Sequence, residues 1–186
     1  MKKTKLGPTT LLFPMPALLV GTVVDGKVNF MTAAWCGIAN QKPPAISVAI
    51  RKSRLSLKGI QENGVFSINV PSVEQVKEVD FCGIYSGRKR DKSQLFEVFY
   101  GDLENVPLIR ESPLNLECTV LNTMDIGTHD LVIGEIIHTH VTDSVLNEGV
   151  PDPEKINPLI YCTGSSGGYY ALGAHVAKAF HVGKDV

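Results

Sequence analysis

Long apolar segments are missing from this sequence of 186 residues. A helix that crosses a bilayer needs about 20 consecutive apolar residues, and no stretch reaches that length. The lysine-rich start and the apolar run over residues 11–24 resemble a signal peptide. However, Pro14 and Pro16 interrupt the run, and no small-residue cleavage site follows it. We therefore expect a cytoplasmic protein without membrane partners.

Closely spaced cysteines are also missing. The four cysteines are Cys36, Cys82, Cys118 and Cys162, and they contain no C-x-x-C pair. Structural zinc ligands usually come in close pairs, whereas scattered cysteines are typical of reduced thiols in a reducing compartment. His138 and His140 would share one face of a strand, but the sequence identifies no third ligand. We expect reduced thiols and no metal site.

A strong charge of either sign is absent as well. Lysine and arginine number 18 and the acidic residues 19, so the formal net charge is −1. Such a balance gives no overall attraction to nucleic acid or to an anionic membrane, and any anion site must be local. With 44% hydrophobic and 20% charged residues, the composition indicates a globular chain, and we expect residues 1–186 to form one domain.

What the sequence does contain is a series of short strand patterns. Residues 17–24 and 27–35 flank Asp25-Gly26, a strong hairpin signal. Residues 45–50 place three isoleucine or valine side chains on one face and only alanine and serine on the other, which leaves room for a flat group against the sheet. Further strands are expected at residues 65–70, 114–120, 131–141 and 158–162.

Two helices interrupt the strands. Residues 53–63 form the first, closed by Gly64. The second follows Pro71, with Ser72 and Gln75 as a capping-box pair and Gly83 as its stop. Many short strands with a few peripheral helices predict a mostly β fold, a small closed or half-closed barrel.

The best candidate for a local anion site is the junction Arg51-Lys52-Ser53-Arg54-Leu55-Ser56. It lies where a strand gives way to a helix, and a helix start presents free N–H groups and a partial positive charge. Basic and hydroxyl side chains at that point suit a phosphate. An ordinary serine-capped helix with solvated charges is the alternative.

Two further segments could complete such a site. The basic loop over residues 86–92 could form a second wall and bring Lys92 near an electron-accepting ring, or it could be a turn in solvent. As a nucleic-acid surface it is weak, because no aromatic residues are interleaved. In the strand over residues 27–35, Asn29 and Thr32 are polar and Ala33-Ala34 is small, which suits either a flat ring or simple barrel packing.

A histidine stands at the entry to the strand near residue 131. His129 follows Gly127-Thr128 beside Asp125 and Asp130, where it could donate a hydrogen bond or titrate near neutral pH. A histidine in a surface turn is the alternative. The sequence has no G-x-G-x-x-G dinucleotide fingerprint.

The order of these segments resembles a known family. In sequence order, the segments are NFMTAAW at residues 29–35, the PP-x-ISVAI strand at 43–50, RKSRLS at 51–56, NGVFSINV at 63–70, CGIYSGRKRDK at 82–92 and GTHDLVIGEI at 127–136. This series is similar to the flavin-reductase-like FMN-binding split-barrel family, in particular its flavoredoxin-like branch. The similarity extends from about residue 11 to residue 173.

The resemblance implies a six-stranded Greek-key split barrel, an FMN at its edge and a homodimer. Carried over position by position, the expected FMN-binding residues are Asn29, Thr32, Ala33, Ala34, Trp35, Arg51, Ser53, Arg54, Ser56, Ser86, Gly87 and Lys92. His129 would approach the flavin or a nicotinamide, although many reductases of the family have Asp where this chain has Thr128. Tyr169 and Tyr170 would cap the flavin or pack at the dimer contact.

The implied function is that of an FMN-dependent oxidoreductase or electron-transfer flavoprotein. In such a protein the flavin carries the chemistry, while the protein supplies binding and electrostatics. Two roles stay open: a reductase that takes hydride from NADH or NADPH, and a carrier that is reduced by a redox partner protein. A non-enzymatic β-barrel that contacts nucleic acid through its basic loops is the alternative from another class; we expect no nucleic-acid partner.

Overall fold

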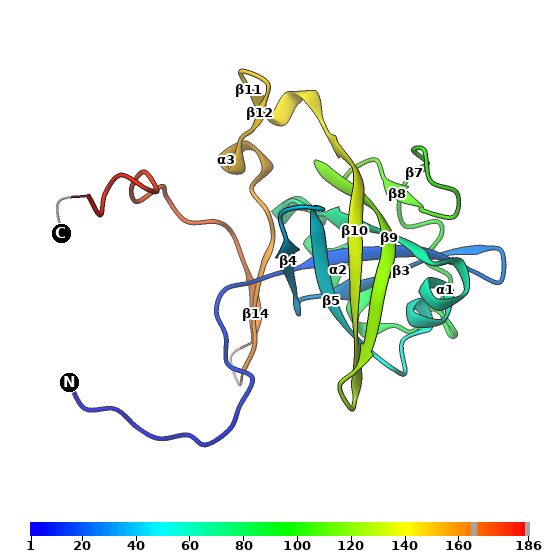
Figure 1. Ribbon diagram of the computed structural model, residues 1–186, viewed down its shortest axis with the longest axis horizontal. Helices are drawn as coiled ribbons and strands as arrows, with labels where there is room; N and C mark the ends of the chain where they lie inside the picture. Colours follow the sequence, from blue (N-terminus) through cyan, green and yellow to red (C-terminus); the bar gives the residue numbers. More distant parts are fainter. Residues whose placement is uncertain (165–166, 185–186) are drawn as a thin grey trace.

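The computed structural model describes residues 1–164 and 167–184. Its centre is a seven-stranded antiparallel sheet with the strand order β3-β2-β6-β9-β10-β5-β4 (Figure 1). The strands are β2 (Leu18–Val24), β3 (Lys27–Ala33), β4 (Cys36–Asn40), β5 (Ala45–Arg51), β6 (Val65–Val70), β9 (Leu114–Asp125) and β10 (His129–Val141).

The sheet closes into a barrel because β3 and β4 are nearly one strand. Only Ala34 and Trp35 separate them along the chain, yet β3 lies at one edge of the strand order and β4 at the other. The chain bends at these two residues and so joins both edges. When β3 and β4 are counted as one bent strand, the barrel has six strands, and the predicted split barrel is confirmed.

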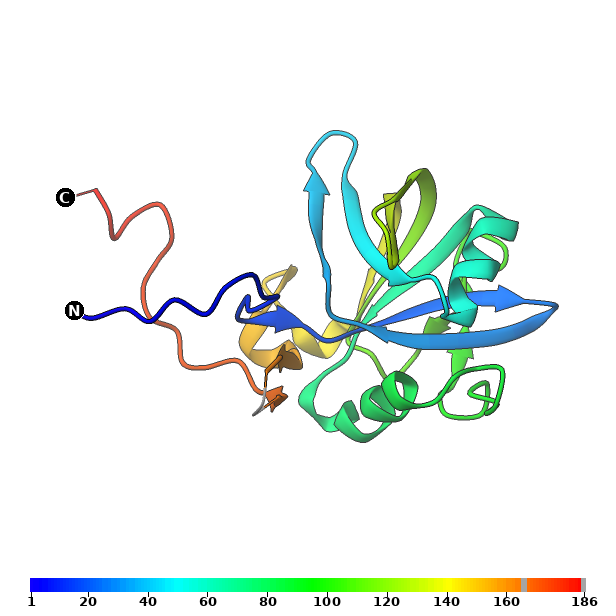
Figure 2. The same ribbon diagram turned by 90° about the horizontal axis from the view of Figure 1, so that it is seen from below.

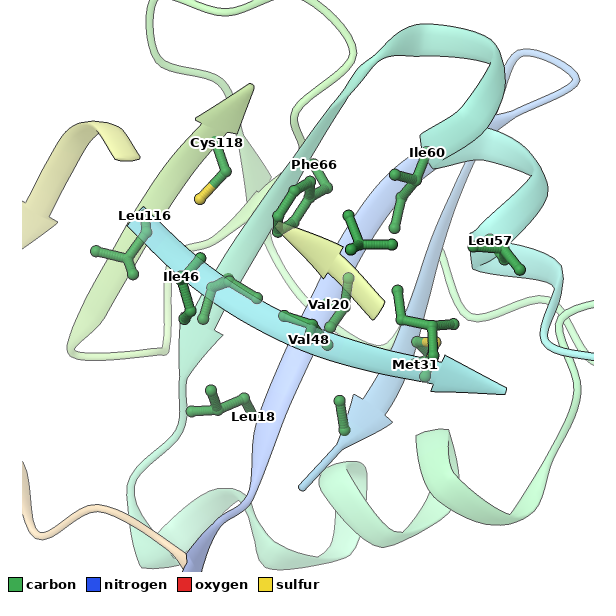
Figure 3. Packing of buried hydrophobic residues seen from close by; sticks show 14 residues of the cluster. Leu18, Val20, Met31, Ile46, Val48, Leu57, Ile60, Phe66, Leu116 and Cys118 are labelled. Atoms are coloured by element: carbon green, nitrogen blue, oxygen red, sulfur yellow. The ribbon is translucent and has the colours of Figure 1, made fainter. Parts of the chain in front are cut away.

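The barrel interior is filled by the apolar faces of its strands. Ile46, Val48 and Ile50 of β5 belong to the barrel core, as their alternation predicts. Phe66 of β6 packs in the same cluster as Ile46 and Val48 (Figure 3). Gly134 of β10 lies against the Phe66 ring, where a side chain would collide with it, and the strand has an irregular register at this point. Each of these fully buried side chains contributes roughly 1.5–3 kcal/mol.

Two helices cover the barrel, and their ends differ in how well the sequence predicts them. Helix α1 (Leu55–Asn63) closes one opening of the barrel and ends at Gly64 in the left-handed conformation, as expected. The capping box of Ser72 and Gln75 is also present, at the start of the 3-10 turn η1 (Val73–Gln75) that leads into α2 (Val76–Ile84).

The predicted stop at Gly83 is wrong. Helix α2 continues through Gly83 to Ile84, and the N–H of Tyr85 still donates to the carbonyl of Phe81. The chain then leaves in an extended conformation rather than through a left-handed residue, so the end of this helix does not require a glycine.

Smaller elements surround the barrel. Strands β1 (Met15–Pro16), β13 (Ile160–Cys162) and β14 (Gly168–Tyr170) form a three-stranded sheet beside α2. The remaining elements are β7 (Val98–Phe99), β8 (Leu108–Ile109), η2 (Asp143–Val145), β11 (Leu146–Asn147), β12 (Val150–Pro151) and α3 (Pro153–Ile156).

Two arms extend from the barrel on the same side (Figures 1 and 2). Residues 1–14 form the N-terminal arm and residues 171–184 the described part of the C-terminal arm, and every residue in both is exposed. Within the described ranges, no helix is both long enough and apolar enough to span a membrane.

Candidate functional site

A cavity of about 790 Å³ lies where the end of β3, the start of α1, helix α2 and the β13–β14 hairpin meet. We call it the main cavity. Thr32, Ala34 and Arg54 line it, so the structure brings three of the predicted site residues together. Its other lining residues are Ala17, Val76, Lys77, Asp80, Gly83, Ile84, Tyr161, Gly164, Gly167, Gly168 and Tyr169. The volume is in the range of small-molecule and cofactor sites.

The start of α1 borders this cavity through Arg54 and is not capped by a side chain. Arg54 is the N-cap residue, no side chain accepts a hydrogen bond from the first-turn N–H groups, and the first turn contains no acidic residue. The hydroxyl of Ser53 makes no hydrogen bond to any described residue, so the serine-capped alternative is not observed. The Arg54 guanidinium at this uncapped helix start therefore gives the adjoining end of the cavity a positive charge.

The neighbouring basic residues serve other contacts. Lys52 Nζ lies 2.7 Å from Oδ1 of Asp125 and 3.7 Å from Oδ1 of Asp130, across the β9–β10 turn. The hydrogen bond to Asp125 raises the pKa of Lys52. Arg51 is exposed at the end of β5 and pairs in register with His129. Of the three basic side chains at this junction, only Arg54 reaches the main cavity.

The floor of the cavity comes from the end of β3. Thr32 donates its hydroxyl hydrogen to the carbonyl of Val79 and so ties β3 to α2. Ala34 is small and half-buried and leaves the floor flat. Ala33 does not line the cavity, because alternate residues of a strand face opposite sides and its side chain is in the barrel core.

Trp35 and His129 lie together outside the main cavity. Their ring centroids are 4.9 Å apart with an interplanar angle of 35°, and Nδ1 of His129 is 2.8 Å from the hydroxyl of Thr128. Trp35 lines a second, apolar cavity of about 420 Å³, together with residues of the N-terminal arm. Ala34 lines both cavities, so one residue separates them.

Asn29, Ser56 and Gly87 pack together at the first turn of α1, where Asn29 and Ser56 are buried and Gly87 is half-buried. Nδ2 of Asn29 donates to Oγ of Ser56 at 2.7 Å. Gly87 lies so close that a Cβ atom there would overlap Oδ1 of Asn29. Neither Ser56 nor Gly87 lines the main cavity, and Asn29 and Gly87 border a smaller one of about 310 Å³. Ser86 begins the adjoining turn, where its hydroxyl accepts from the N–H of Arg88.

Lys92 is buried beneath the cavity floor, although its position in a basic loop suggested a more open place. Only 2% of the residue is exposed. Its Nζ donates to the carbonyl of Phe30 at 2.9 Å and to that of Cys82 at 3.0 Å, which joins β3 to α2. Burial lowers the pKa of Lys92, and the charge of Arg54 lowers it further.

Sequence reasoning missed the α2 wall of the cavity. Lys77, Asp80 and Ile84 recur along one face of α2 and line the cavity with Val76, whereas Val79 and Cys82 are buried. The hydroxyl of Tyr169 donates to Oδ1 of Asp80 at 3.1 Å. Burial and then this carboxylate raise the pKa of Tyr169. Tyr169 thus lines the cavity, whereas Tyr170 points to solvent.

The two strand histidines contact carboxylates elsewhere. His140 Nε2 lies 2.6 Å from Oε1 of the buried Glu117, and His138 Nε2 lies 3.2 Å from Oδ2 of Asp102. Glu117 also accepts from the N–H groups of Leu103 and Asp102, so these contacts attach the loop after β7 to the barrel. Across residues 1–164 and 167–184, no three His, Cys, Asp or Glu side chains gather as a metal site would require.

The residues of the main cavity fit FMN. A positive end at Arg54 suits a phosphate, and the small floor at Thr32 and Ala34 suits a flat ring, with Tyr161 and Tyr169 as an aromatic wall. The lining combines apolar surface with polar side chains, as in cofactor sites generally.

Comparisons with known proteins identify the family of this chain. The model of the flavin reductase like domain matches residues 10–170. Flavoredoxin from Methanosarcina acetivorans is 40% identical with a TM-score of 0.96, and the match covers 100% of this chain and 99% of that one. Flavoredoxin of Desulfovibrio vulgaris (Miyazaki F) is 38% identical with a TM-score of 0.91 over 98% and 100% of the two chains.

A flavin reductase (NADH) from Kitasatospora aureofaciens is 28% identical over 160 residues, which are 82% of this chain and 76% of that protein. The family model covers most of the chain, and the two flavoredoxins match it over nearly their full length. The chain therefore belongs to the flavin-reductase-like domain family, in its flavoredoxin-like branch.

Proposed function

We propose that this chain binds FMN in the main cavity and functions as an FMN-dependent electron-transfer flavoprotein. The observation that carries the proposal is the uncapped start of α1, whose N-cap residue Arg54 lines the cavity together with Thr32 and Ala34. Family membership supports it independently. We also propose that residues 1–186 act as one FMN-binding domain.

The residues of this chain have distinct tasks in the proposal. When bound, FMN supplies a ring that accepts and releases electrons. Arg54 and the first-turn N–H groups of α1 hold the phosphate, Ala34 leaves space for the ring, and Tyr169 shields it from water. Thr32 and Lys92 hold β3 against α2: Thr32 of β3 donates to a carbonyl of α2, and Lys92 donates to one carbonyl of each element. No side chain is assigned as an essential acid or base.

Two electron donors are compatible with this site. A redox partner protein is our first choice, because the similarity to the two flavoredoxins, at 38% and 40% identity, exceeds the 28% identity to the NADH-dependent reductase. Direct reduction by NADH or NADPH is the second. In that case a nicotinamide would enter over the ring, on the side where His129 and Trp35 stand.

We further propose that the chain is a cytoplasmic homodimer. Its four cysteines are free thiols, which suits a reducing compartment. Twofold dimers are the commonest assembly, and large apolar side chains such as Trp35, Ile38 and Met124 are exposed on the barrel.

The test is a flavin titration of the purified protein and of Arg54→Ala. Loss of the guanidinium removes charge-assisted hydrogen bonds of about 1.5–3 kcal/mol, so the Kd for FMN should rise roughly 10- to 150-fold. Arg110→Ala is the matched control, because Arg110 pairs with Glu97 and does not line the main cavity. A wild-type protein that takes up no FMN, or an Arg54→Ala protein with unchanged Kd, would refute the assignment.

A second experiment identifies the electron donor. The FMN-loaded protein is mixed with NADH or NADPH without air, and its flavin absorption is followed. Bleaching by either nucleotide supports the reductase role. Bleaching only when a reduced redox protein is added supports the carrier role.

A further inference from the structure

The C-terminal arm is too apolar for a solvated tail. Solvated tails are poor in apolar residues and rich in charge. Residues 171–184 instead contain Leu172, Val176, Phe180 and Val182, with two lysines and no acidic residue. Val176 is 96% exposed and Phe180 is 99% exposed. None of the described hydrogen bonds joins this arm to the barrel. These side chains therefore lack an apolar surface to pack against.

The barrel has such a surface around Trp35. The second cavity, of about 420 Å³, is lined by Ala34, Trp35, Cys36 and residues 9–12 and 14–16, and its lining is mainly apolar. Strand β4 adjoins it and stands at the edge of the strand order, with Ile38 74% exposed. An exposed apolar edge strand is normally covered in a native protein. The uncovered surface thus lies at the end of the barrel from which the arms depart (Figure 2).

We propose that the C-terminal arm of one copy of this chain lies across a second copy and covers its Trp35 cavity and β4 edge. The arm leaves β14 and points away from its own barrel (Figures 1 and 2), so its own cavity is not in its path. When extended, residues 171–184 span about 46 Å, enough to cross a neighbouring barrel. A twofold pair satisfies both copies at once, because each contributes one arm and one cavity.

The arrangement would complete the cofactor site. Ala34 separates the main cavity from the Trp35 cavity and lines both. An arm seated on the Trp35 side would fix the wall beside the proposed FMN site, so this consequence rests on the proposed function. The exchange of arms itself does not.

Trp35 is the only tryptophan of the chain, so its emission reports whether the cavity is covered. In the FMN-free protein, the double variant Val176→Asp/Phe180→Asp should shift Trp35 emission to longer wavelength. It should also raise the dimer dissociation constant roughly tenfold or more, since two buried apolar side chains become charged. Val150→Asp is the matched control, because Val150 is 64% exposed on β12, away from the arm and the cavity. Unchanged emission in the double variant would refute the proposal.

A mixing experiment separates exchange between copies from folding back within one copy. The double variant, which keeps Trp35, is mixed with an excess of Trp35→Phe chains that keep an intact arm. If arms are exchanged, the intact arm covers the remaining Trp35 and its emission returns toward the wild-type wavelength. If the emission stays shifted, each arm covers its own barrel and the proposal is wrong.

The same samples keep this proposal distinct from the proposed function. If the wild type binds no FMN but the mixed variants regain the wild-type emission, the flavin assignment is overturned and the exchange of arms still holds. If the wild type binds FMN but the mixed variants keep the shifted emission, the exchange of arms is overturned and the flavin assignment still holds. If both hold, the double variant should also bind FMN several-fold more weakly than Val150→Asp.

Discussion

Replacing Gly87 by alanine should destabilise the protein although the change adds only one methyl group. A Cβ atom at Gly87 would overlap Oδ1 of Asn29 and lie 3.0 Å from Cδ2 of Leu55. Overpacking of this kind costs about 1–3 kcal/mol. If Asn29 moves away, its 2.7 Å hydrogen bond to Ser56 is lost in a buried place, which costs roughly another 1–3 kcal/mol. The expected loss is therefore about 2–6 kcal/mol, a large part of a typical folding free energy.

Urea unfolding of the FMN-free protein measures this loss. With a slope of about 2 kcal/mol per molar urea, the midpoint should fall by on the order of 1–3 M. Gly83→Ala is the control of opposite sign: its added methyl group would meet Thr32 at an ordinary 3.6 Å, and alanine is favoured by roughly 0.5–1 kcal/mol inside a helix. The double variant Asn29→Ala/Gly87→Ala should be no less stable than Asn29→Ala, because the overlap is gone.

Two outcomes would refute this reasoning. A Gly87→Ala midpoint equal to that of the wild type would show that the close contact with Asn29 carries no energy. Strict additivity in the double variant would mean that the loss arises elsewhere.

Three further predictions concern buried polar groups. Lys92→Met should cost about 1–3 kcal/mol by leaving two carbonyls unpaired. Because burial lowers the folded pKa of Lys92 below 10.5, the unfolded chain binds more protons, and wild-type stability should rise relative to Lys92→Met as pH approaches 10.5 in urea titrations. Burial acts to raise the pKa of Glu117, but hydrogen bonds from His140 and two N–H groups hold it below 4.5. The wild type should therefore have a larger free energy of unfolding than Glu117→Gln at neutral pH. In acid unfolding curves this difference should disappear as pH falls through the folded pKa. Tyr169→Phe should lose about 0.5–1.5 kcal/mol in urea unfolding through its bond to Asp80, and unchanged stability would show that this bond does not fix the cavity wall.

The elements that the sequence predicts well are those with a strong local signal. The hairpin at Asp25-Gly26 forms with both residues at positive φ, as its turn type requires. The alternation of β5 and the capping box before α2 also reappear. Strand β4 escaped prediction because it is almost entirely exposed, and so it shows no alternation between apolar and polar residues.

Only part of the site could be predicted from the sequence, again because only some of its residues lie in segments with a strong local signal. Thr32, Ala34 and Arg54 lie next to one another through the topology of β3, β5 and α1, and the motifs that carry them are local. Asp80 and Tyr161 come from elements whose docking depends on tertiary packing, and the polar face of an amphipathic helix resembles a solvated face. Burial of Lys92 could not be predicted, because the two carbonyls that accept its hydrogen bonds come from other elements of the chain.

The bend between β3 and β4 gives three consecutive residues three different surroundings. Ala33 packs in the barrel interior, Ala34 borders the main cavity, and Trp35 stands on the outer side. A mutagenesis series along this tripeptide could thus alter folding, flavin affinity and subunit association one at a time. Descendants of the same barrel could likewise diverge in cofactor or partner through neighbouring codons, without rebuilding the scaffold.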